Sequence, residues 1–342
     1  MDSQVFILNE KRNVTLTAYL QDDSQEFWRA KKRPAVVIFP GGAYAYCSDR
    51  EADPVAQEYL RAGYHAFVLR YSVGWENAVW PNPLEDYDQA MELIAAHAKE
   101  WHLIPEKIAV IGFSAGGHLA ACAATMAKHR PAAAILAYPV ILEGLAAICA
   151  KGAPGADKAV DSQTCPCFIA ATGTDTTVSA MNSLRFVEAL YENGISSELH
   201  LYAFGPYGFS TARTSIADPA ELCSRTLHWV EDSISWLEDV FGAFTSGEMS
   251  SPRCPGRVRK DKDPYLSVNC QLATIAGNQM AVERLKQLIL VEETTQKWIA
   301  EQKENLLTSE MTLRSALQFL NVPGEVIRKA DEILSEIPNR KQ

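Results

Sequence analysis

One serine stands in a pattern that nucleophilic chemistry uses. Residues 112–116 read Gly-Phe-Ser-Ala-Gly, which fits G-x-S-x-G with Ser114 at the centre. An apolar run, residues 108–112, precedes the pattern, and a helical run, residues 116–129, follows it. This context is what a nucleophile elbow requires, because the turn between strand and helix lifts the serine hydroxyl above the sheet edge. The sequence therefore predicts Ser114 as a nucleophile. The alternative is a glycine-rich turn without chemistry.

A glycine-rich loop is the second chemical feature. An attacked acyl group develops negative charge on its oxygen, and backbone N–H groups can stabilise that charge. Residues 39–44 read Phe-Pro-Gly-Gly-Ala-Tyr and follow the apolar run 35–39. A loop of this kind after an early strand supplies one or two donors, and the amide of Ala115 supplies another. The alternative is a simple turn.

A serine nucleophile also needs a general base, and the base needs an acid that orients it. In the chain order that follows from a G-x-S-x-G elbow, the acid comes after a late strand. Asp175 directly follows the apolar run 167–173 and is the candidate acid. The alternative role for Asp175 is to cap a helix that begins near Met181.

The base is expected in the loop after the last predicted strand, residues 198–204. That loop reads Gly-Pro-Tyr-Gly-Phe, with Tyr207 at the centre, where a histidine would be expected. A neutral phenol, with a reference pKa of ~10, is a poor base at neutral pH. We expect structural roles for His118, on the elbow helix, and for His200, within the last strand. A base relocated to another histidine is the alternative.

The elements that must position these residues follow a regular order. Short apolar runs alternate with helical patterns up to about residue 240, and most runs lack strict alternation, so both faces of the sheet are expected to be covered. The strands are predicted at 35–39, 65–71, 108–113, 132–140, 167–173 and 198–204, and the main helices at 83–98, 116–129, 183–194 and 227–241. This order predicts an α/β fold with a mostly parallel, doubly wound sheet and helices on both faces.

The composition changes after residue 244. Residues 245–265 are rich in Ser, Pro, Gly and charge, which is typical of a linker. Only helical patterns follow, at 281–302, 312–320 and 324–337. The sequence therefore predicts a first domain over 1–244, a linker over 245–265 and a helical C-terminal module over 266–342. The module carries no motif tied to chemistry and is a candidate surface for homo-oligomer formation.

The composition of the chain argues against some classes of binding partner. The chain has 342 residues and a formal net charge of −10 at pH 7, which argues against nucleic acid and anionic membrane surfaces as partners. No segment reaches ~18 uninterrupted apolar residues, and the N-terminus lacks the pattern of a secretory signal. The eight cysteines are scattered, and Cys165 and Cys167 are too close for ordinary zinc-ligand spacing. We expect a cytoplasmic protein with free thiols, no membrane span and no metal site.

Taken together, the motifs resemble the α/β-hydrolase superfamily. The resemblance is strongest to bacterial esterases related to acetylxylan esterases and to the hormone-sensitive-lipase-like and feruloyl-esterase-like branch. It covers residues 15–240 and rests on Pro-Gly-Gly-Ala-Tyr at 40–44, on Gly-Phe-Ser-Ala-Gly-Gly-His-Leu-Ala at 112–120 and on Thr-Gly-Thr-Asp at 172–175. The sequences at 182–184 and 198–200 also match.

The resemblance implies an α/β-hydrolase fold with hydrolysis of small acyl esters, often acetyl groups on sugars, and without a cofactor. It assigns the nucleophile to Ser114 and the acid to Asp175. It assigns the oxyanion hole to the amides of Gly42, Ala43 and Ala115.

The departure from the family is at Tyr207. The family's loop reads Gly-x-His-Gly-Phe, and its histidine is the general base. Loss of a triad member costs roughly 10⁴ to 10⁶ in rate. Three hypotheses follow: a serine esterase weakened by Tyr207, a catalytically impaired pseudo-hydrolase that binds an acylated sugar or similar small ligand, and a variant whose parent carried histidine at this position.

Overall fold

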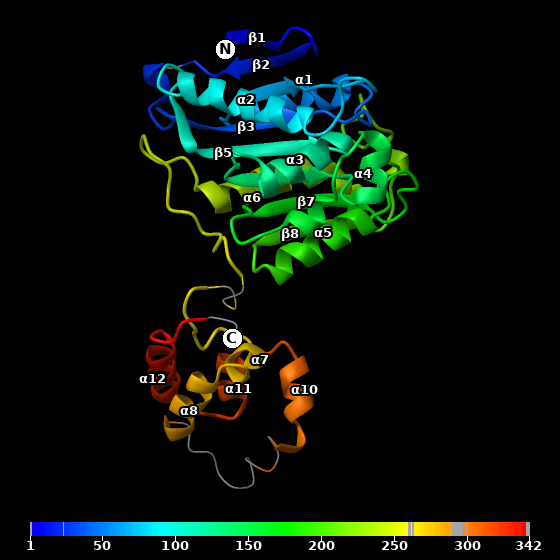
Figure 1. Cartoon of the computed structure of the whole chain (residues 1–342). Helices are drawn as coiled ribbons and strands as arrows, with labels where there is room; N and C mark the ends of the chain where they lie inside the picture. Colours follow the sequence, from blue (N-terminus) through cyan, green and yellow to red (C-terminus); the bar gives the residue numbers. More distant parts are fainter. Residues whose placement is uncertain are drawn as a thin grey trace. The chain divides into compact units, whose positions relative to one another are not determined.

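The computed structural model describes residues 2–22, 24–258, 261, 263–288, 297 and 300–339 (Figure 1). The chain divides into two compact units, Met1–Gly256 and Arg257–Gln342. The division falls within the segment 245–265 that the sequence predicts as a linker.

The first unit is built on one eight-stranded sheet with the order β1-β2-β4-β3-β5-β6-β7-β8 (Figure 1). All neighbours from β4 through β8 pair in parallel, whereas β1 and β2 add an antiparallel edge. The strands are β1 Asp2–Asn9, β2 Val14–Leu20, β3 Arg33–Phe39, β4 His65–Arg70, β5 Leu103–Phe113, β6 Ala133–Ala137, β7 Cys167–Thr172 and β8 Ser197–Tyr202. The predicted fold class and all six predicted strands are confirmed.

The helices form a layer on each face of the sheet. The core of one face joins α1 and α6 to the strands, and the core of the other face joins α2, α3 and α5 to them. The helices are α1 Asp53–Arg61, α2 Asn82–His97, α3 Ala115–Met126, α4 Glu143–Cys149, α5 Met181–Glu192 and α6 Trp229–Phe241. Since parallel strands end at one edge, the loops after β3, β5, β7 and β8 meet there, and these loops carry the predicted site residues.

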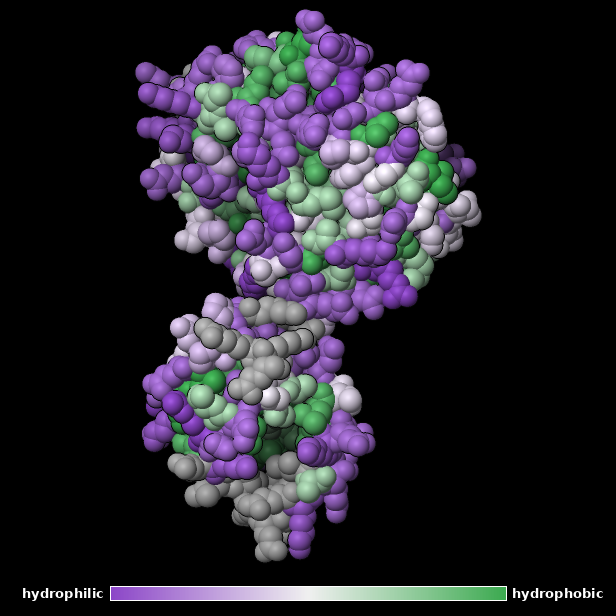
Figure 2. Space-filling model, viewed as in Figure 1, coloured by the Kyte–Doolittle hydropathy of each residue, from purple (hydrophilic) through white to green (hydrophobic). Residues whose placement is uncertain are grey.

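The second unit is helical and has its own core. Its elements are α7 Leu272–Ala276, α8 Gln279–Leu288, α10 Lys303–Thr308, α11 Leu313–Phe319 and α12 Gly324–Leu334. The predicted helix over 281–302 coincides with α8 as far as Leu288; its residues 289–296, 298 and 299 lie outside the described residues. Figure 2 shows hydrophilic residues over much of the visible surface of each unit, with smaller hydrophobic patches between them.

The helices, the cysteines and the potential metal ligands each bear on the class of protein. None of the helices that the structure describes is long and apolar enough to cross a bilayer. All eight cysteines are free thiols. Across the described ranges, no group of three or more His, Cys, Asp or Glu side chains could hold a metal ion.

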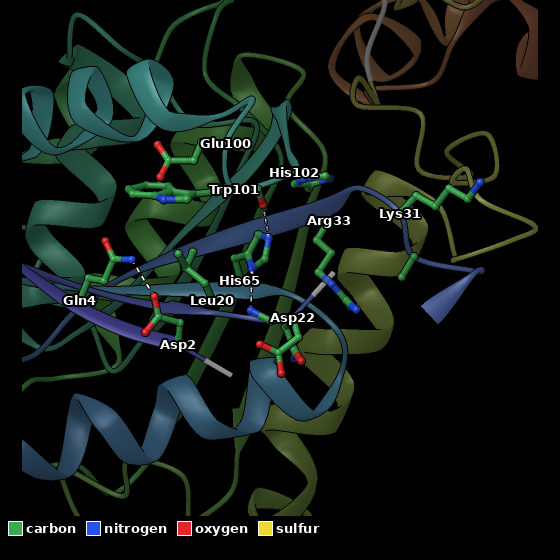
Figure 3. Close-up of a pocket in the computed structure, with 12 residues that line it drawn as sticks. Asp2, Gln4, Leu20, Asp22, Lys31, Arg33, His65, Glu100, Trp101 and His102 are labelled. Atoms are coloured by element: carbon green, nitrogen blue, oxygen red, sulfur yellow. Dashed lines mark hydrogen bonds between the residues drawn. The ribbon is translucent and has the colours of Figure 1, made fainter. Parts of the chain in front are cut away.

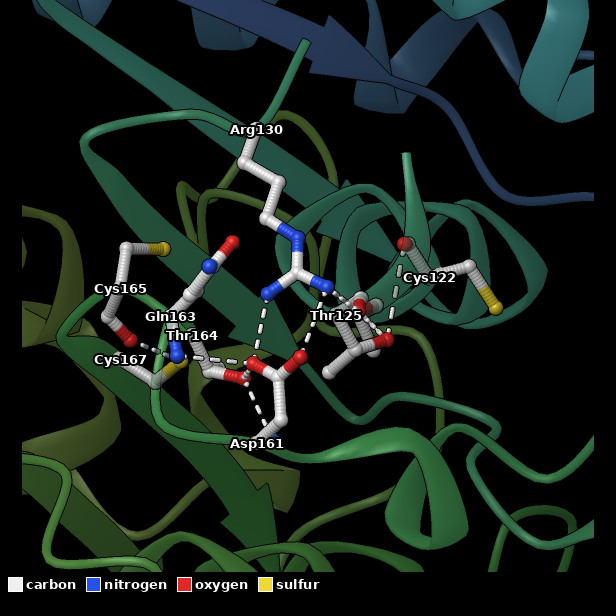
Figure 4. Close-up of polar contacts among 9 residues, drawn as sticks. Cys122, Thr125, Arg130, Asp161, Gln163, Thr164, Cys165 and Cys167 are labelled. Atoms are coloured by element: carbon white, nitrogen blue, oxygen red, sulfur yellow. Dashed lines mark hydrogen bonds and ion pairs between the residues drawn. The ribbon is translucent and has the colours of Figure 1, made fainter. Parts of the chain in front are cut away.

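An ion pair fixes the segment that leads into β7. The Arg130 guanidinium donates to both carboxylate oxygens of Asp161, at 2.6 and 2.9 Å, and also to the carbonyl of Thr125 near the end of α3 (Figure 4). Arg130 lowers the pKa of Asp161 to about 2. Asp161 also accepts the amide of Gln163, so the pair holds the segment before β7 in place.

His65 is a buried histidine at the start of β4. Its Nδ1 accepts the amide of Gln21 at 3.1 Å, and its Nε2 donates to the carbonyl of Trp101 at 2.8 Å (Figure 3). Both ring nitrogens are therefore used by the neutral imidazole. Burial is the main reason that the pKa of His65 falls from 6.5 to about 4.

This shift predicts acid sensitivity. Because the pKa of His65 is lower in the folded state, the unfolded chain binds more protons below pH 6.5, so stability is complete above about pH 6.5 and falls as the pH drops toward 4. The shift corresponds to roughly 3 kcal/mol. We expect His65→Gln to reduce the pH dependence of the free energy of unfolding between pH 7 and 4.5, measured by urea titration, while the part due to the buried His118, whose pKa is also lowered to about 4, remains. Equal slopes in the His65→Gln and unsubstituted chains would contradict this assignment.

Candidate active site

Ser114 occupies a strained turn between β5 and α3. Its φ of 53° and ψ of −114° lie outside the regions that most residues adopt. The amide of Ser114 donates to the carbonyl of Ala137 at 3.1 Å, and its own carbonyl accepts from His118 and Val140 at 3.0 Å each. Three hydrogen bonds therefore hold the backbone of the serine, and they keep the unfavourable turn in place.

Two glycines make this turn possible. A Cβ on Gly112 would lie 2.1 Å from the carbonyl oxygen of Gly116, and a Cβ on Gly116 would lie 2.1 Å from the carbonyl oxygen of Phe39. Both neighbours are backbone atoms that cannot rotate away. The helix that follows Ser114 can therefore approach β3 and β5 this closely only when both positions are glycine.

The loop after β3 borders the serine. A Cβ built on Gly41 would lie 3.2 Å from the Cβ of Ser114. The next three residues, Gly42, Ala43 and Tyr44, have φ values of 124°, 54° and 57°. Among the hydrogen bonds of the described residues, none uses the amide N–H of Gly42, Ala43 or Ala115. These are the three amides assigned to the oxyanion hole, and they are free to donate to a ligand.

Several contacts hold this loop, which we call the oxyanion loop (residues 40–46). The carbonyl of Pro40 accepts the hydroxyl of Tyr71 at 2.5 Å. The amide of Gly41 donates to the carboxylate of Glu51 at 2.7 Å. Burial raises the pKa of Glu51, while the Tyr138 hydroxyl, the Gly41 amide and Arg50 oppose that rise. A buried acidic side chain therefore lies directly behind the loop.

Tyr207 lies in the loop after β8, and its hydroxyl forms a hydrogen bond with the hydroxyl of Ser114. Its ring packs edge-on against Tyr138, with centroids 5.4 Å apart. Burial is the largest cause of a raised pKa for Tyr207, and the nearby Glu51 and Asp175 add to the rise. The phenol therefore keeps its proton at neutral pH and is not a proton acceptor for the neighbouring hydroxyl of Ser114.

Asp175 lies in the loop after β7. One carboxylate oxygen accepts the amides of Thr177 and Val178, at 2.8 and 2.9 Å. The other is buried and has no hydrogen-bond partner within the described ranges. Burial raises the pKa of the carboxyl. The helix α5 begins later, at Met181, with Ala180 as its N-cap, so Asp175 does not cap it.

Hydrogen bonds connect the loop that carries Asp175 with the loop that carries Tyr207. The hydroxyls of Thr172 and Thr174 both donate to the carbonyl of Gly205 at 3.0 Å. A phenol has one polar atom, and here that atom contacts Ser114. An imidazole has two nitrogens on different sides of its ring and can contact a serine and a carboxylate together. The unpartnered oxygen of Asp175 is what such a second nitrogen would satisfy.

The two other histidines near the motifs have different contacts. The ring of His118 hydrogen-bonds the hydroxyl of Tyr44 at 2.9 Å and the carbonyl of Pro154 at 2.8 Å. Both of its nitrogens are thus occupied away from Ser114. His200, on β8, hydrogen-bonds Glu198 at 2.7 Å and lies 3.5 Å from Asp232. These contacts agree with the structural roles predicted for both residues.

Known proteins with similar sequences and folds identify the family of this chain. A solved structure, MGS-M1, an α/β-hydrolase enzyme from a Medee basin deep-sea metagenome library, is 42% identical, with a TM-score of 0.65, over 70% of this chain and 98% of that chain. The chain belongs to the α/β-hydrolase family. A family model described as BD-FAE matches residues 26–140 of this α/β-hydrolase, the segment that contains the oxyanion loop and the elbow.

The names of two curated relatives refer to xylan as their substrate. The chain is 31% identical over 229 residues to endo-1,4-beta-xylanase B of Butyrivibrio fibrisolvens, which is 58% of this chain and 35% of the relative. It is 28% identical over 197 residues to acetylxylan esterase of Xylanibacter ruminicola, which is 51% of this chain and 41% of the relative. The α/β-hydrolase thus spans well under half the length of each of these curated relatives.

Sequence reasoning missed part of this site. The structure brings Ser114, Tyr207 and the oxyanion loop together, and it joins the loop of Asp175 to them. It also adds Glu51 and Tyr138, which no motif indicated. The only signal for Glu51 was an acidic residue beside Arg50 shortly after the glycine-rich loop, and such pairs are common on protein surfaces.

Proposed function

We propose that this α/β-hydrolase is a serine-dependent carboxylic ester hydrolase that acts on small acyl esters, and that acetylated carbohydrates are its substrates. The observation that carries the proposal is Ser114 on a strained elbow, next to three backbone amides that are free to bind an oxyanion. The names of the xylanase and acetylxylan esterase relatives support the carbohydrate class.

In the proposed reaction, Ser114 Oγ attacks the acyl carbon, and the carbonyl oxygen takes up negative charge. The amides of Gly42, Ala43 and Ala115 stabilise that charge. The C–O bond to the alcohol then breaks, the alcohol leaves with a proton, and water hydrolyses the acyl-serine to regenerate the hydroxyl. Each proton transfer needs a base near neutral pH, and Tyr207 does not supply one, so we expect slow turnover.

The test compares the chain with Ser114→Ala. We expect weak hydrolysis of p-nitrophenyl acetate and weak release of acetate from acetylated xylo-oligosaccharides, both absent in Ser114→Ala. A fluorophosphonate probe should label the unsubstituted chain slowly and Ser114→Ala not at all. If no chain, including one with histidine at position 207, hydrolyses either ester in a Ser114-dependent way, the esterase proposal is wrong.

A second candidate function is ligand binding without turnover. It is favoured by the hydrogen bond between Ser114 and Tyr207, which ties the nucleophile to a group that holds its proton. Calorimetric titration of the chain with acetylated xylo-oligosaccharides separates the two candidates. Binding without acetate release, in both the chain and Ser114→Ala, would support the binding function.

A further inference from the structure

Glu51 is a buried carboxylate that the proposed reaction does not use. It lies in a short turn, Asp49–Glu51, and only 2% of its surface is exposed. One oxygen accepts the amide of Gly41 at 2.7 Å, and the other accepts the hydroxyl of Tyr138 at 2.7 Å. The Nε of Arg50 lies 3.8 Å from the second oxygen. Each oxygen of this buried carboxylate therefore has a hydrogen-bond donor, and a cation lies nearby.

The first of these bonds holds the oxyanion loop. Gly41 precedes three residues with positive φ, two of which, Ala43 and Tyr44, are not glycine. Such conformations cost of order 1 kcal/mol or more each and persist only where the surroundings fix them. The bond to Glu51 also sets the orientation of the Gly41 peptide, and through it the start of the turn that presents the next two amides.

The second bond reaches the loop of Tyr207. The Tyr138 hydroxyl that donates to Glu51 also accepts the amide of Ser210 at 3.1 Å, and the hydroxyl of Ser210 donates to the carbonyl of Arg50 at 2.6 Å. The ring of Tyr138 packs against Tyr207. The turn that carries Glu51 therefore contacts both sides of the site, the oxyanion loop and the loop that follows β8.

We propose that Glu51 is a positioning residue that couples the oxyanion loop to the loop of residue 207. It keeps the amides of Gly42 and Ala43 aimed at the reacting carbonyl while it holds Tyr138 against position 207. This proposal rests on the proposed function. Glu51 acts through Gly41 and Tyr138 and does not itself touch the substrate.

The first arm of the test measures turnover. Glu51→Gln and Glu51→Ala are made in the unsubstituted chain and together with Tyr207→His, and kcat and KM are measured for p-nitrophenyl acetate. We expect kcat to fall about 100-fold, the cost of misplacing an oxyanion donor, while KM changes by less than about threefold. The matched control is Asp161→Asn. Asp161 is also a carboxylate that accepts a backbone amide and a side-chain donor, but it precedes β7, whereas the candidate site residues follow the carboxyl ends of the strands.

The second arm does not depend on turnover. Hydrogen exchange is followed by mass spectrometry over residues 40–48 and 205–212. We expect faster exchange in both segments in Glu51→Gln and unchanged exchange there in Asp161→Asn. If Glu51→Ala does not fold, Glu51→Gln decides the question, because its side chain keeps the size of glutamate.

The two arms separate the proposal from the proposed function. Ser114-dependent turnover that Glu51→Gln leaves unchanged overturns the positioning role and leaves the esterase function standing. Faster exchange in both loops, with no Ser114-dependent turnover in any variant, supports the positioning role while the esterase function fails. Exchange that rises in only one of the two loops overturns the coupling.

Discussion

Tyr207→His is expected to raise the rate of p-nitrophenyl acetate hydrolysis by about 10³- to 10⁵-fold, because it would add the general base that the proposed triad lacks. The hydroxyl of Tyr207 already contacts the Ser114 hydroxyl, so the ring at this position faces the nucleophile. An imidazole there would accept the serine proton through one nitrogen and donate to the free oxygen of Asp175 through the other. The measurement is kcat/KM at pH 7.5.

Three controls make this result specific. Tyr207→Phe keeps the ring and removes the hydroxyl, and it should hydrolyse the ester no faster than the unsubstituted chain. Ser114→Ala should abolish the gained activity. Asp175→Asn should cost about 10⁴-fold when histidine is present and have little effect when tyrosine is present, because only an imidazole needs the acid to orient it.

One outcome would contradict the assignment of the base position. If the unsubstituted chain already turns over at an ordinary esterase rate and Tyr207→His changes it little, the base must be another residue. In that case the loss of activity in single substitutions of the remaining histidines would locate it.

Gly116→Ala is expected to destabilise the first unit by more than about 4 kcal/mol. The added Cβ would lie 2.1 Å from the carbonyl oxygen of Phe39 and 2.5 Å from that of Pro40. Neither atom can move without displacing β3 or the oxyanion loop. The free energy of unfolding is measured by urea titration with tryptophan fluorescence, which reports mainly on this unit because six of the seven tryptophans precede residue 257.

Gly144→Ala is the matched control for this substitution. Gly144 lies in α4, and a Cβ there would meet no atom within 4 Å. The change should leave stability within about 1 kcal/mol, with a small gain because alanine favours the helix. A Gly116→Ala chain that unfolds like the control and still reacts with a fluorophosphonate probe would show that the elbow does not need glycine at this position.

Much of the first unit was predictable from sequence because its strands are buried on both faces. Continuous apolar runs of strand length bounded by turns predicted β3 to β8, and glycine spacing predicted the elbow. The antiparallel edge was not predicted. β1 is mostly exposed, so its pattern resembles that of many polar surface segments. β2 alternates buried and half-buried residues, which is the pattern of a strand with one buried face, but it was not among the predicted strands. The place of β1 at the sheet edge comes from its pairing with β2, and β2 in turn pairs with β4; local sequence does not encode either pairing.

The site could be predicted only where a motif carries its chemistry. Ser114 and the glycine-rich loop are local patterns with a physical reason for each residue. Glu51 and Tyr138 are 87 positions apart in sequence and meet only because the turn before α1 folds behind the loop after β6. Contacts of this kind depend on tertiary packing, which local spacing does not specify.

The separate core of the helical unit has a consequence for the thermodynamics of the whole chain. The residues that bury its interior, Leu266 through Ile337, form a cluster of their own, distinct from both clusters that flank the sheet. Two units that bury independent interiors need not melt as one cooperative block. We therefore expect a calorimetric trace of this protein to require the sum of two transitions with separate enthalpies, and not one transition temperature.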